Sequence, residues 1–178
     1  MSAQTVEALG KTPIFNGLLD SEVARIVEVG RVEYWQENAL VLEEGSYGPR
    51  MMVLLEGTVE ILRRDPSGVQ RSITELGPGE ILGEMSLLLD MPRTATVRAI
   101  TGLRVFAMDR AAFQELVDSG DPAVLKFGLQ LARVMAVRLM RLNDKVVDLL
   151  MATEGSAPLK EKFSKARQEI FNLWDYED

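Results

Sequence analysis

Apolar residues follow different periods along the chain, and each period predicts a different kind of element. Before residue 30, Val23, Ile26 and Val27 recur at spacings of three and four, which predicts one buried face of a helix. Asp20-Ser21 is a candidate N-cap of that helix, and Thr12-Pro13 ends an earlier helical piece. We therefore expect two helical segments before the first strand.

Between Arg31 and Met108 the pattern changes to short runs of Val, Ile, Leu and Thr that are separated by glycines. Short strands with such turns are typical of a β-barrel or a jelly roll. Residues 52–62 predict a hairpin that turns near Gly57. The sequence Asp65-Pro66-Ser67-Gly68 predicts a second turn.

After Met108 the apolar period is helical again. Asp109 is a candidate cap of a short helix that ends near Gly120, and Asp121-Pro122 opens a long helix. Two rows in the long helix repeat every seven residues: Leu125, Ala132, Leu139 and Val146, and Gly128, Met135, Leu142 and Leu149. This heptad seam predicts a homodimer in which two copies of the helix pair. A neighbouring stripe is expected to pack on the barrel, and its members are Val124, Phe127, Leu131 and Val134.

The last part of the chain has its own pattern. Gly155, Ser156 and Pro158 interrupt the helical period, and residues 159–174 resume it as an amphipathic stretch. We expect one domain over residues 1–150, including the long helix, and a helical extension over residues 151–178. Because an independent domain usually needs about 50 residues, we expect no DNA-binding domain after Leu150.

Composition narrows the range of functions. The 178 residues carry a net charge of −7, which disfavours nonspecific binding to nucleic acid or to an anionic membrane. The chain contains no cysteine and no histidine, so disulfides, zinc ribbons, thiol nucleophiles and most metal sites are not expected. No apolar run approaches the length of a membrane span, about 20 residues, and no signal sequence is recognisable. We therefore expect a cytoplasmic protein with no metal, no cofactor and no catalytic residues.

The candidate chemistry lies in residues 77–97. Glycines lead into a short apolar helix that is expected to begin near Glu84, and Arg93 follows Pro92 after that helix. The N–H groups at a helix N-terminus and the guanidinium of Arg93 both suit a phosphate, and the Glu84 carboxylate suits a ribose hydroxyl. The residues thus indicate a pocket for a sugar phosphate. The alternatives are that Arg93 is a solvated loop residue and that Glu84 only caps the helix.

This segment resembles the phosphate-binding cassette of the cyclic nucleotide-binding domain family. The matching residues are Gly83-Glu84, Met85-Ser86, Leu87, Pro92-Arg93 and Ala95, with the family's ten-residue step from the glycine to the arginine. The resemblance implies a mixed α+β, mainly β fold: an eight-stranded jelly roll flanked by N-terminal helices and a long C-terminal helix. The sequence departs from the family's pattern in the barrel, where Gly45-Ser46 and Met51-Met52 stand in place of a frequent aspartate and frequent aromatic residues.

The resemblance also implies that the ligand is cAMP or cGMP. Glu84 would then bind the ribose 2′-hydroxyl and Arg93 the cyclic phosphate. Backbone N–H groups would complete the cradle, contributed by Gly83, Glu84, Met85, Ser86, Thr94 and Ala95. Thr94 is either an ordinary strand residue or, as in cGMP-selective members of the family, a contact to the guanine amino group.

A protein of this kind is a sensor that signals by repacking the helices after its barrel. The receiver of the signal would be an effector protein. One alternative is a transcription regulator of the catabolite activator type that lacks or borrows its DNA-binding part. Another is an enzyme on a jelly-roll barrel such as a cupin, which the absence of histidine disfavours.

Overall fold

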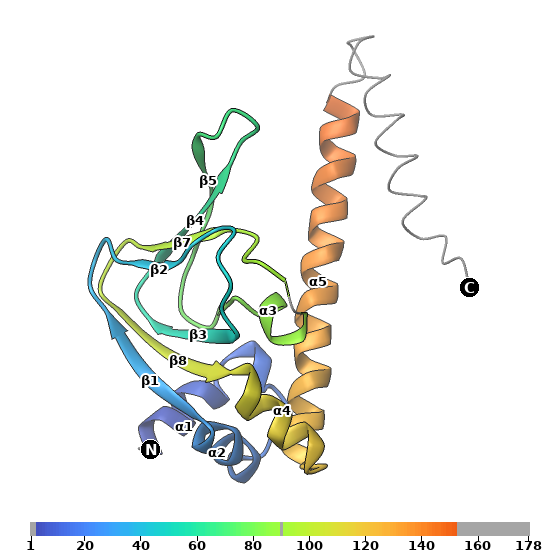
Figure 1. Cartoon of the computed structure of the whole chain (residues 1–178). Coiled ribbons are helices and arrows are strands. Elements are labelled where there is room, and N and C mark those ends of the chain that lie inside the picture. Colours follow the sequence, from blue (N-terminus) through green and yellow to red (C-terminus); the bar gives the residue numbers. More distant parts are fainter. Residues whose placement is uncertain (1–2, 90, 153–178) are drawn as a thin grey trace. The chain divides into compact units, whose positions relative to one another are not determined.

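Two four-stranded antiparallel sheets form the body of the protein (Figure 1). The computed structural model describes residues 3–89 and 91–152, with side chains up to residue 148. One sheet has the strand order β1-β8-β3-β6 and the other has the order β2-β7-β4-β5. The strands are β1 (Gly30–Trp35), β2 (Leu40–Leu42), β3 (Arg50–Glu56), β4 (Val59–Arg64), β5 (Gln70–Leu76), β6 (Ile81–Leu82), β7 (Thr96–Ala99) and β8 (Leu103–Asp109). This arrangement confirms the eight-stranded jelly roll.

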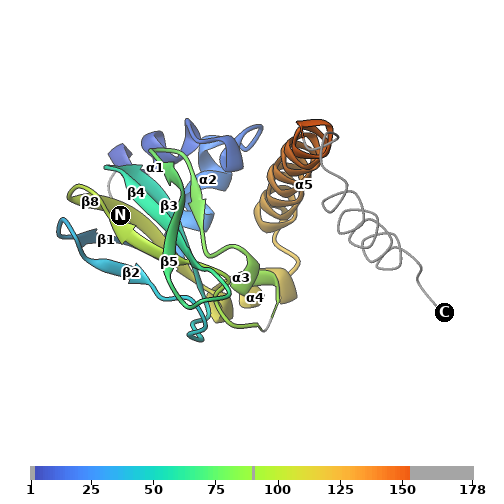
Figure 2. The same ribbon diagram turned by 90° about the horizontal axis from the view of Figure 1, so that it is seen from above.

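Helices precede, interrupt and follow the strands. They are α1 (Ala3–Gly10), the 3₁₀ turn η1 (Pro13–Phe15), α2 (Asp20–Glu28), α3 (Met85–Leu88), α4 (Arg110–Asp118) and α5 (Pro122–Ala152). The two N-terminal helices contact each other, and α1 contacts β3 while α2 contacts β1 (Figure 2). Within the described part of the chain, no helix combines the length and the hydropathy of a membrane span.

The main core lies between the sheets. Ten buried residues from six strands meet there, namely Val41, Met52, Leu54, Val59, Leu82, Val97, Ala99, Leu103, Val105 and Ala107. The opposite faces of β3 and β8 are buried as well, since Met51 and Phe106 are both fully inaccessible to solvent. A strand that is buried on both faces has a continuous apolar run rather than an alternating one, which explains the sequence Met51-Met52-Val53-Leu54.

The hairpin predicted at Gly57 is wrong. Gly57 does turn the chain, with φ of +92°, but β3 belongs to one sheet and β4 to the other, so the two strands do not pair. A Cβ at this glycine would lie 2.4 Å from the carbonyl oxygen of Gly102, which shows how closely the chain crosses between the sheets there. The turn at Asp65–Gly68 is confirmed, since it joins the paired strands β4 and β5.

Helix ends agree with the predictions in position but differ in their capping. Asp20 is the first residue of α2 and not its cap: the Leu19 N–H donates instead to the Glu22 carboxylate at 2.9 Å. Asp109 occupies the N-cap position of α4, yet its side chain makes no hydrogen bond to that helix. Asp121 accepts a hydrogen bond from the Ala123 N–H at 2.9 Å and so opens α5 as expected.

The chain divides into two compact units, residues 1–132 and 133–178, and α5 begins in the first. In that unit Val124, Phe127 and Leu131 are buried, which confirms this part of the predicted packing stripe. The ring of Phe127 lies 5.3 Å from that of Phe15 and 6.1 Å from that of Phe113, measured between centroids. These aromatic contacts join the start of α5 to η1 and α4. The predicted break at Gly155–Pro158 and the stretch 159–174 lie outside the described residues.

Candidate functional site

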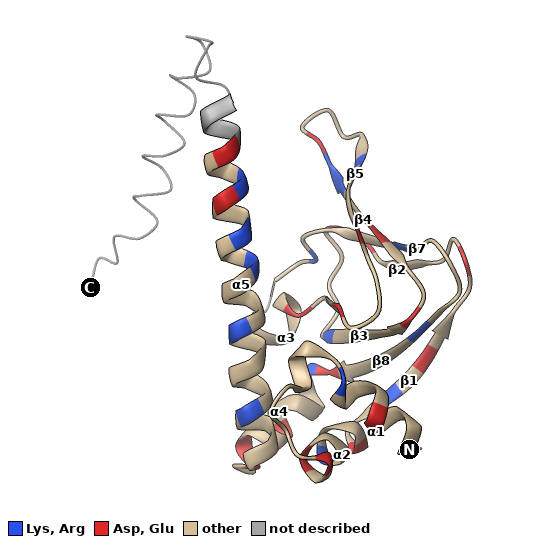
Figure 3. Cartoon of the chain, turned by 180° about the vertical axis from the view of Figure 1, so that it is seen from behind, with Lys and Arg blue, Asp and Glu red and all other residues tan. Residues whose placement is uncertain are grey.

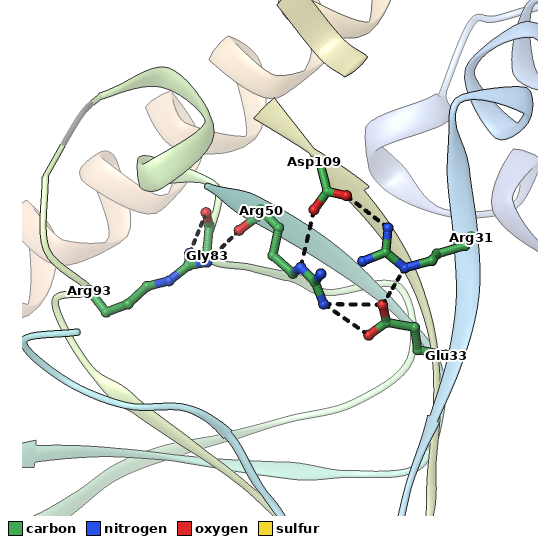
Figure 4. A network of polar contacts seen from close by, with 6 residues as sticks. All are labelled: Arg31, Glu33, Arg50, Gly83, Arg93 and Asp109. Atoms are coloured by element: carbon green, nitrogen blue, oxygen red, sulfur yellow. Dashed lines mark hydrogen bonds and ion pairs between the residues drawn. The ribbon is translucent and has the colours of Figure 1, made fainter. Parts of the chain in front are cut away.

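Arg93 is a cation with only 5% of its surface exposed. Its Nη1 donates to the Gly83 carbonyl at 3.0 Å and its Nη2 donates to the Arg50 carbonyl at 2.7 Å (Figure 4). The backbone is held too, because the Arg93 N–H donates to the Ser46 carbonyl and the Arg93 carbonyl accepts from the Gly45 N–H, both at 2.8 Å. The guanidinium therefore has a defined position beside the start of β3.

Two glycines make room for this guanidinium. Gly83 has φ of +70°, and a Cβ there would lie only 2.2 Å from Arg93 Nη1. A Cβ at Gly48 would lie 3.3 Å from Nη2, which is close contact without overlap. The glycine of the predicted cassette is thus required both by its backbone conformation and by the arginine ten residues later.

The charge of Arg93 is only partly compensated. Among the described residues its hydrogen-bond acceptors are neutral carbonyls, and they use two of the five N–H donors of a guanidinium. Burial, and then the nearby Arg50 cation, lower the pKa of Arg93, while the Glu84 carboxylate acts in the opposite direction. Arginine nevertheless remains protonated at neutral pH. A buried cation with spare donors is suited to bind an anion.

The other predicted site residues lie around α3. Glu84 is at the N-cap position of α3, and both Glu84 and Met85 are partly buried. Ser86 is buried, and its N–H donates to the Gly83 carbonyl at 3.2 Å. Because α3 has only four residues, its dipole adds little and Arg93 supplies most of the positive potential. The structure therefore brings Gly83, Glu84 and Arg93 together.

Thr94 and Ala95 lie just before β7 and show less interaction. Thr94 is exposed, and its hydroxyl donates weakly to the Met85 sulfur at 3.9 Å. Ala95 is partly buried. The structure places Thr94 beside Met85, the first residue of α3.

Sequence reasoning did not predict that four charged residues meet beside the cassette, a group that we call the charge ring: Arg31, Glu33, Arg50 and Asp109 (Figure 4). Arg50 contacts Glu33 at 3.1 Å and Asp109 at 3.2 Å. Arg31 contacts the same two carboxylates at 2.7 and 2.8 Å. The only sequence signal was an arginine at the start of an apolar strand. No group of three or more potential metal ligands occurs among the described residues.

Comparison with known proteins adds to this geometry. Residues 32–119 match the sequence family described as "Cyclic nucleotide-binding domain". The chain is 33% identical over 162 residues to the CRP-like cAMP-activated global transcriptional regulator of Mycobacterium tuberculosis, a match that covers 91% of this chain and 70% of that protein. It is 30% identical over 109 residues to a cAMP-dependent protein kinase regulatory subunit of Eremothecium gossypii, covering 61% of this chain and 23% of that protein.

A solved structure agrees with the sequence matches. The catabolite activator protein of Thermus thermophilus superposes with a TM-score of 0.69 and 28% identity, over 79% of this chain and 63% of that one.

Replacement of Gly83 by alanine tests the close approach of Arg93. Gly68 is the matched control, because it also has positive φ, +84°, but has nothing within 4 Å of an added Cβ. We expect Gly68→Ala to lower the free energy of unfolding by about 1–2 kcal/mol, the cost of the left-handed backbone. Gly83→Ala should lower the free energy of unfolding by about 1–3 kcal/mol more than Gly68→Ala does, because the new Cβ displaces a buried, hydrogen-bonded guanidinium. Urea denaturation measures both, and equal losses would contradict the geometry.

The charge ring predicts a loss of stability in acid. A hydrogen bond from Arg31 lowers the pKa of the Asp109 carboxyl, and Arg50 adds to this. Since the pKa is lower in the folded state than the value of about 3.9 in the unfolded state, the ionised carboxylate stabilises the fold above that pH, and the contribution disappears as the pH falls through the folded-state value. The difference in urea midpoint between wild type and Asp109→Asn should therefore be largest near pH 7 and shrink below about pH 4. A difference independent of pH would refute this role.

Proposed function

Since the chain belongs to the cyclic nucleotide-binding domain family, we propose that it is a regulatory module that binds cAMP or cGMP at residues 83–95. The observation that carries the proposal is the buried guanidinium of Arg93, which has neutral acceptors and lies near the Glu84 carboxylate. A cyclic phosphate has one negative charge, and this cation can meet it with its remaining donors. The Glu84 carboxylate can then accept a hydrogen bond from a sugar hydroxyl next to that phosphate.

Each residue of the site has a role in this proposal. Arg93 binds the phosphate and Glu84 accepts a hydrogen bond from the ribose 2′-hydroxyl. Backbone N–H groups of residues 83–86 and 94–95 surround the phosphate. The bond from the Ser86 N–H to the Gly83 carbonyl is at the long end of the usual range, so a phosphate oxygen can compete for this donor.

Signal transmission follows the contacts of α3. This helix contacts both β3 and α4. The Phe113 ring of α4 contacts the Phe127 ring of α5, so a ligand that shifts α3 also changes the packing of the helices after the barrel. Such a shift requires a difference in ligand affinity between two packings. We propose an effector protein, in the cytoplasm, as the receiver of the signal, with no direct binding to nucleic acid and no membrane association.

The proposal includes no chemical step. Without histidine or cysteine, the chain lacks the side chains that most often act as general base or thiol nucleophile near neutral pH. The bound nucleotide is therefore expected to be released unchanged, which chromatography of a long incubation checks.

A transcription regulator is the second candidate. It is favoured by the match to the Mycobacterium tuberculosis regulator, which covers 91% of this chain. The chain spans 70% of that protein's length. A gel-shift assay at low salt, with and without cyclic nucleotide, distinguishes the candidates, because the first predicts no retarded DNA in either case.

We also propose that the module is a homodimer whose interface is the seam of α5. Among the seam residues, Leu125, Ala132, Leu139 and Leu142 are exposed, while Gly128, Met135 and Val146 are partly exposed. Leu149 also belongs to the seam, although its side chain is outside the described part. Charged residues are spread along α5 (Figure 3). By their positions in the sequence, those between 126 and 148 all lie outside the two heptad rows. An apolar stripe of this length is rare on a monomer.

Arg93→Ala tests the binding site. Charge-assisted hydrogen bonds are worth about 1.5–3 kcal/mol, so the affinity for cAMP and cGMP should fall by about 10- to 100-fold. Arg98→Ala is the control: Arg98 lies on β7, pairs with Glu60 at 2.5 Å and is not part of the site, so its loss should change affinity less than about twofold. Calorimetry with both nucleotides gives the values and the base preference. Wild-type protein that binds neither nucleotide at millimolar concentration would refute the proposed function.

Two aspartates in the seam test the dimer. Leu139 and Leu142 are 47% and 58% exposed, and burial of each leucine is worth about 1.5–3 kcal/mol. The double variant Leu139→Asp/Leu142→Asp should therefore sediment as a folded monomer at tens of micromolar. Val137→Asp, at a 45% exposed position outside the seam, should remain dimeric. A wild-type monomer under the same conditions would exclude the proposed interface.

A further inference from the structure

Arg50 is the residue through which the charge ring reaches the phosphate-binding arginine. Its carbonyl accepts the 2.7 Å hydrogen bond from Arg93, while its side chain lies between the carboxylates of Glu33 and Asp109 (Figure 4). The carbonyl and the side chain belong to one residue, so any force that holds the Arg50 side chain also restricts the acceptor of Arg93.

The ring holds Arg50 from two other strands. Glu33 belongs to β1, Arg50 begins β3 and Asp109 ends β8, and in the β3–β8 ladder Arg50 is paired with Asp109. Arg31 closes the ring, because it contacts the same two carboxylates as Arg50. Two cations and two anions alternate, and a closed arrangement of this kind is more rigid than an isolated surface pair.

Charge compensation gives the ring a second effect on Arg93. Arg50 and Arg93 are both cations and lie close enough for Arg50 to lower the pKa of Arg93. Glu33 and Asp109 neutralise Arg50 at short range, with side-chain exposures of 19% and 39%. Arg50 can thus remain beside Arg93 at a lower electrostatic cost, with its backbone carbonyl as the group that Arg93 contacts.

We propose that Arg50 is a positioning residue for phosphate recognition: held by Glu33 and Asp109, it fixes the carbonyl that orients the Arg93 guanidinium. Arg50 does not contact the phosphate in this scheme and acts only through Arg93. The inference rests on the proposed binding of a cyclic nucleotide.

A double-mutant cycle tests this role. Arg50→Met keeps the length of the side chain but removes both ion pairs, and it should weaken cAMP or cGMP binding by about 5-fold, the factor that corresponds to one net hydrogen bond. If Arg50 acts through Arg93, the same substitution in an Arg93→Ala background should change affinity by less than about twofold. Calorimetry on the full chain measures all four proteins.

Arg104→Met is the matched control. Arg104 pairs with Glu56 at the other end of the same β3–β8 ladder and is similarly shielded, at 20% exposure against 31% for Arg50. Arg104→Met should leave the affinity for cAMP and cGMP unchanged. Arg50→Lys, which keeps the charge but cannot bridge two carboxylates as a fork, should lie between wild type and Arg50→Met, and it serves in the cycle if the methionine variant unfolds.

The outcomes separate this inference from the proposed function. Three results would overturn the positioning role of Arg50 but leave nucleotide binding in place. They are an equal loss of affinity from Arg50→Met in both backgrounds, an equal loss of affinity from Arg104→Met, and no loss of affinity from Arg50→Met. Wild-type protein without measurable binding would overturn both.

Discussion

A buried guanidinium is the constraint on which the rest of the site depends. A charge as buried as that of Arg93 must be hydrogen-bonded, and the nearest acceptors are the carbonyls of Gly83 and Arg50. The first carbonyl is available only because position 83 has no Cβ and takes a left-handed conformation. The loop at Gly45-Ser46 then pairs with the backbone of Arg93 itself. The Arg93 residue thus requires a glycine at position 83 and binds the loop at Gly45-Ser46 through its backbone.

The charge ring lies at the end of the first sheet where β3 begins and β8 ends, and its member Arg50 acts directly on Arg93. The four residues form a closed ring of ion pairs, and Asp109 shows the competition with helix capping: it stands at the N-cap position of α4, but its carboxylate accepts hydrogen bonds from two arginines. Ion pairs with two partners in fixed geometry are favoured over a single weak cap. The side chain of Asp109 therefore stabilises the sheet, although the residue stands at the N-cap position of α4.

The first part of α5 has buried apolar residues on one side and exposed apolar residues on another. Within the first unit Val124, Phe127 and Leu131 are buried on one side, while Leu125 and Leu129 on another side are more than half exposed. A surface helix usually has one apolar stripe, which faces the core, and α5 has exposed apolar residues beside that stripe. The exposed stripe lies on α5, whereas the cassette lies on α3 and the segment that leads into β7.

Local patterns in the sequence determined the elements and the cassette. Spacings of three and four, heptads and glycine turns act over a few residues, so the N-terminal helices, a body of short strands, α4 and α5 could be predicted from them, and the glycines before Glu84 together with Arg93 indicated the chemical character of the pocket. The number of strands came from the resemblance to the family. Only the tertiary structure decided which strands pair. It separated β3 from β4 despite the turn at Gly57, and it brought Arg50 to Arg93 across 43 positions of the chain. The physical reason is that pairing and ion contacts depend on the arrangement of distant segments, and an arginine at the start of an apolar strand has no local pattern that marks its partner.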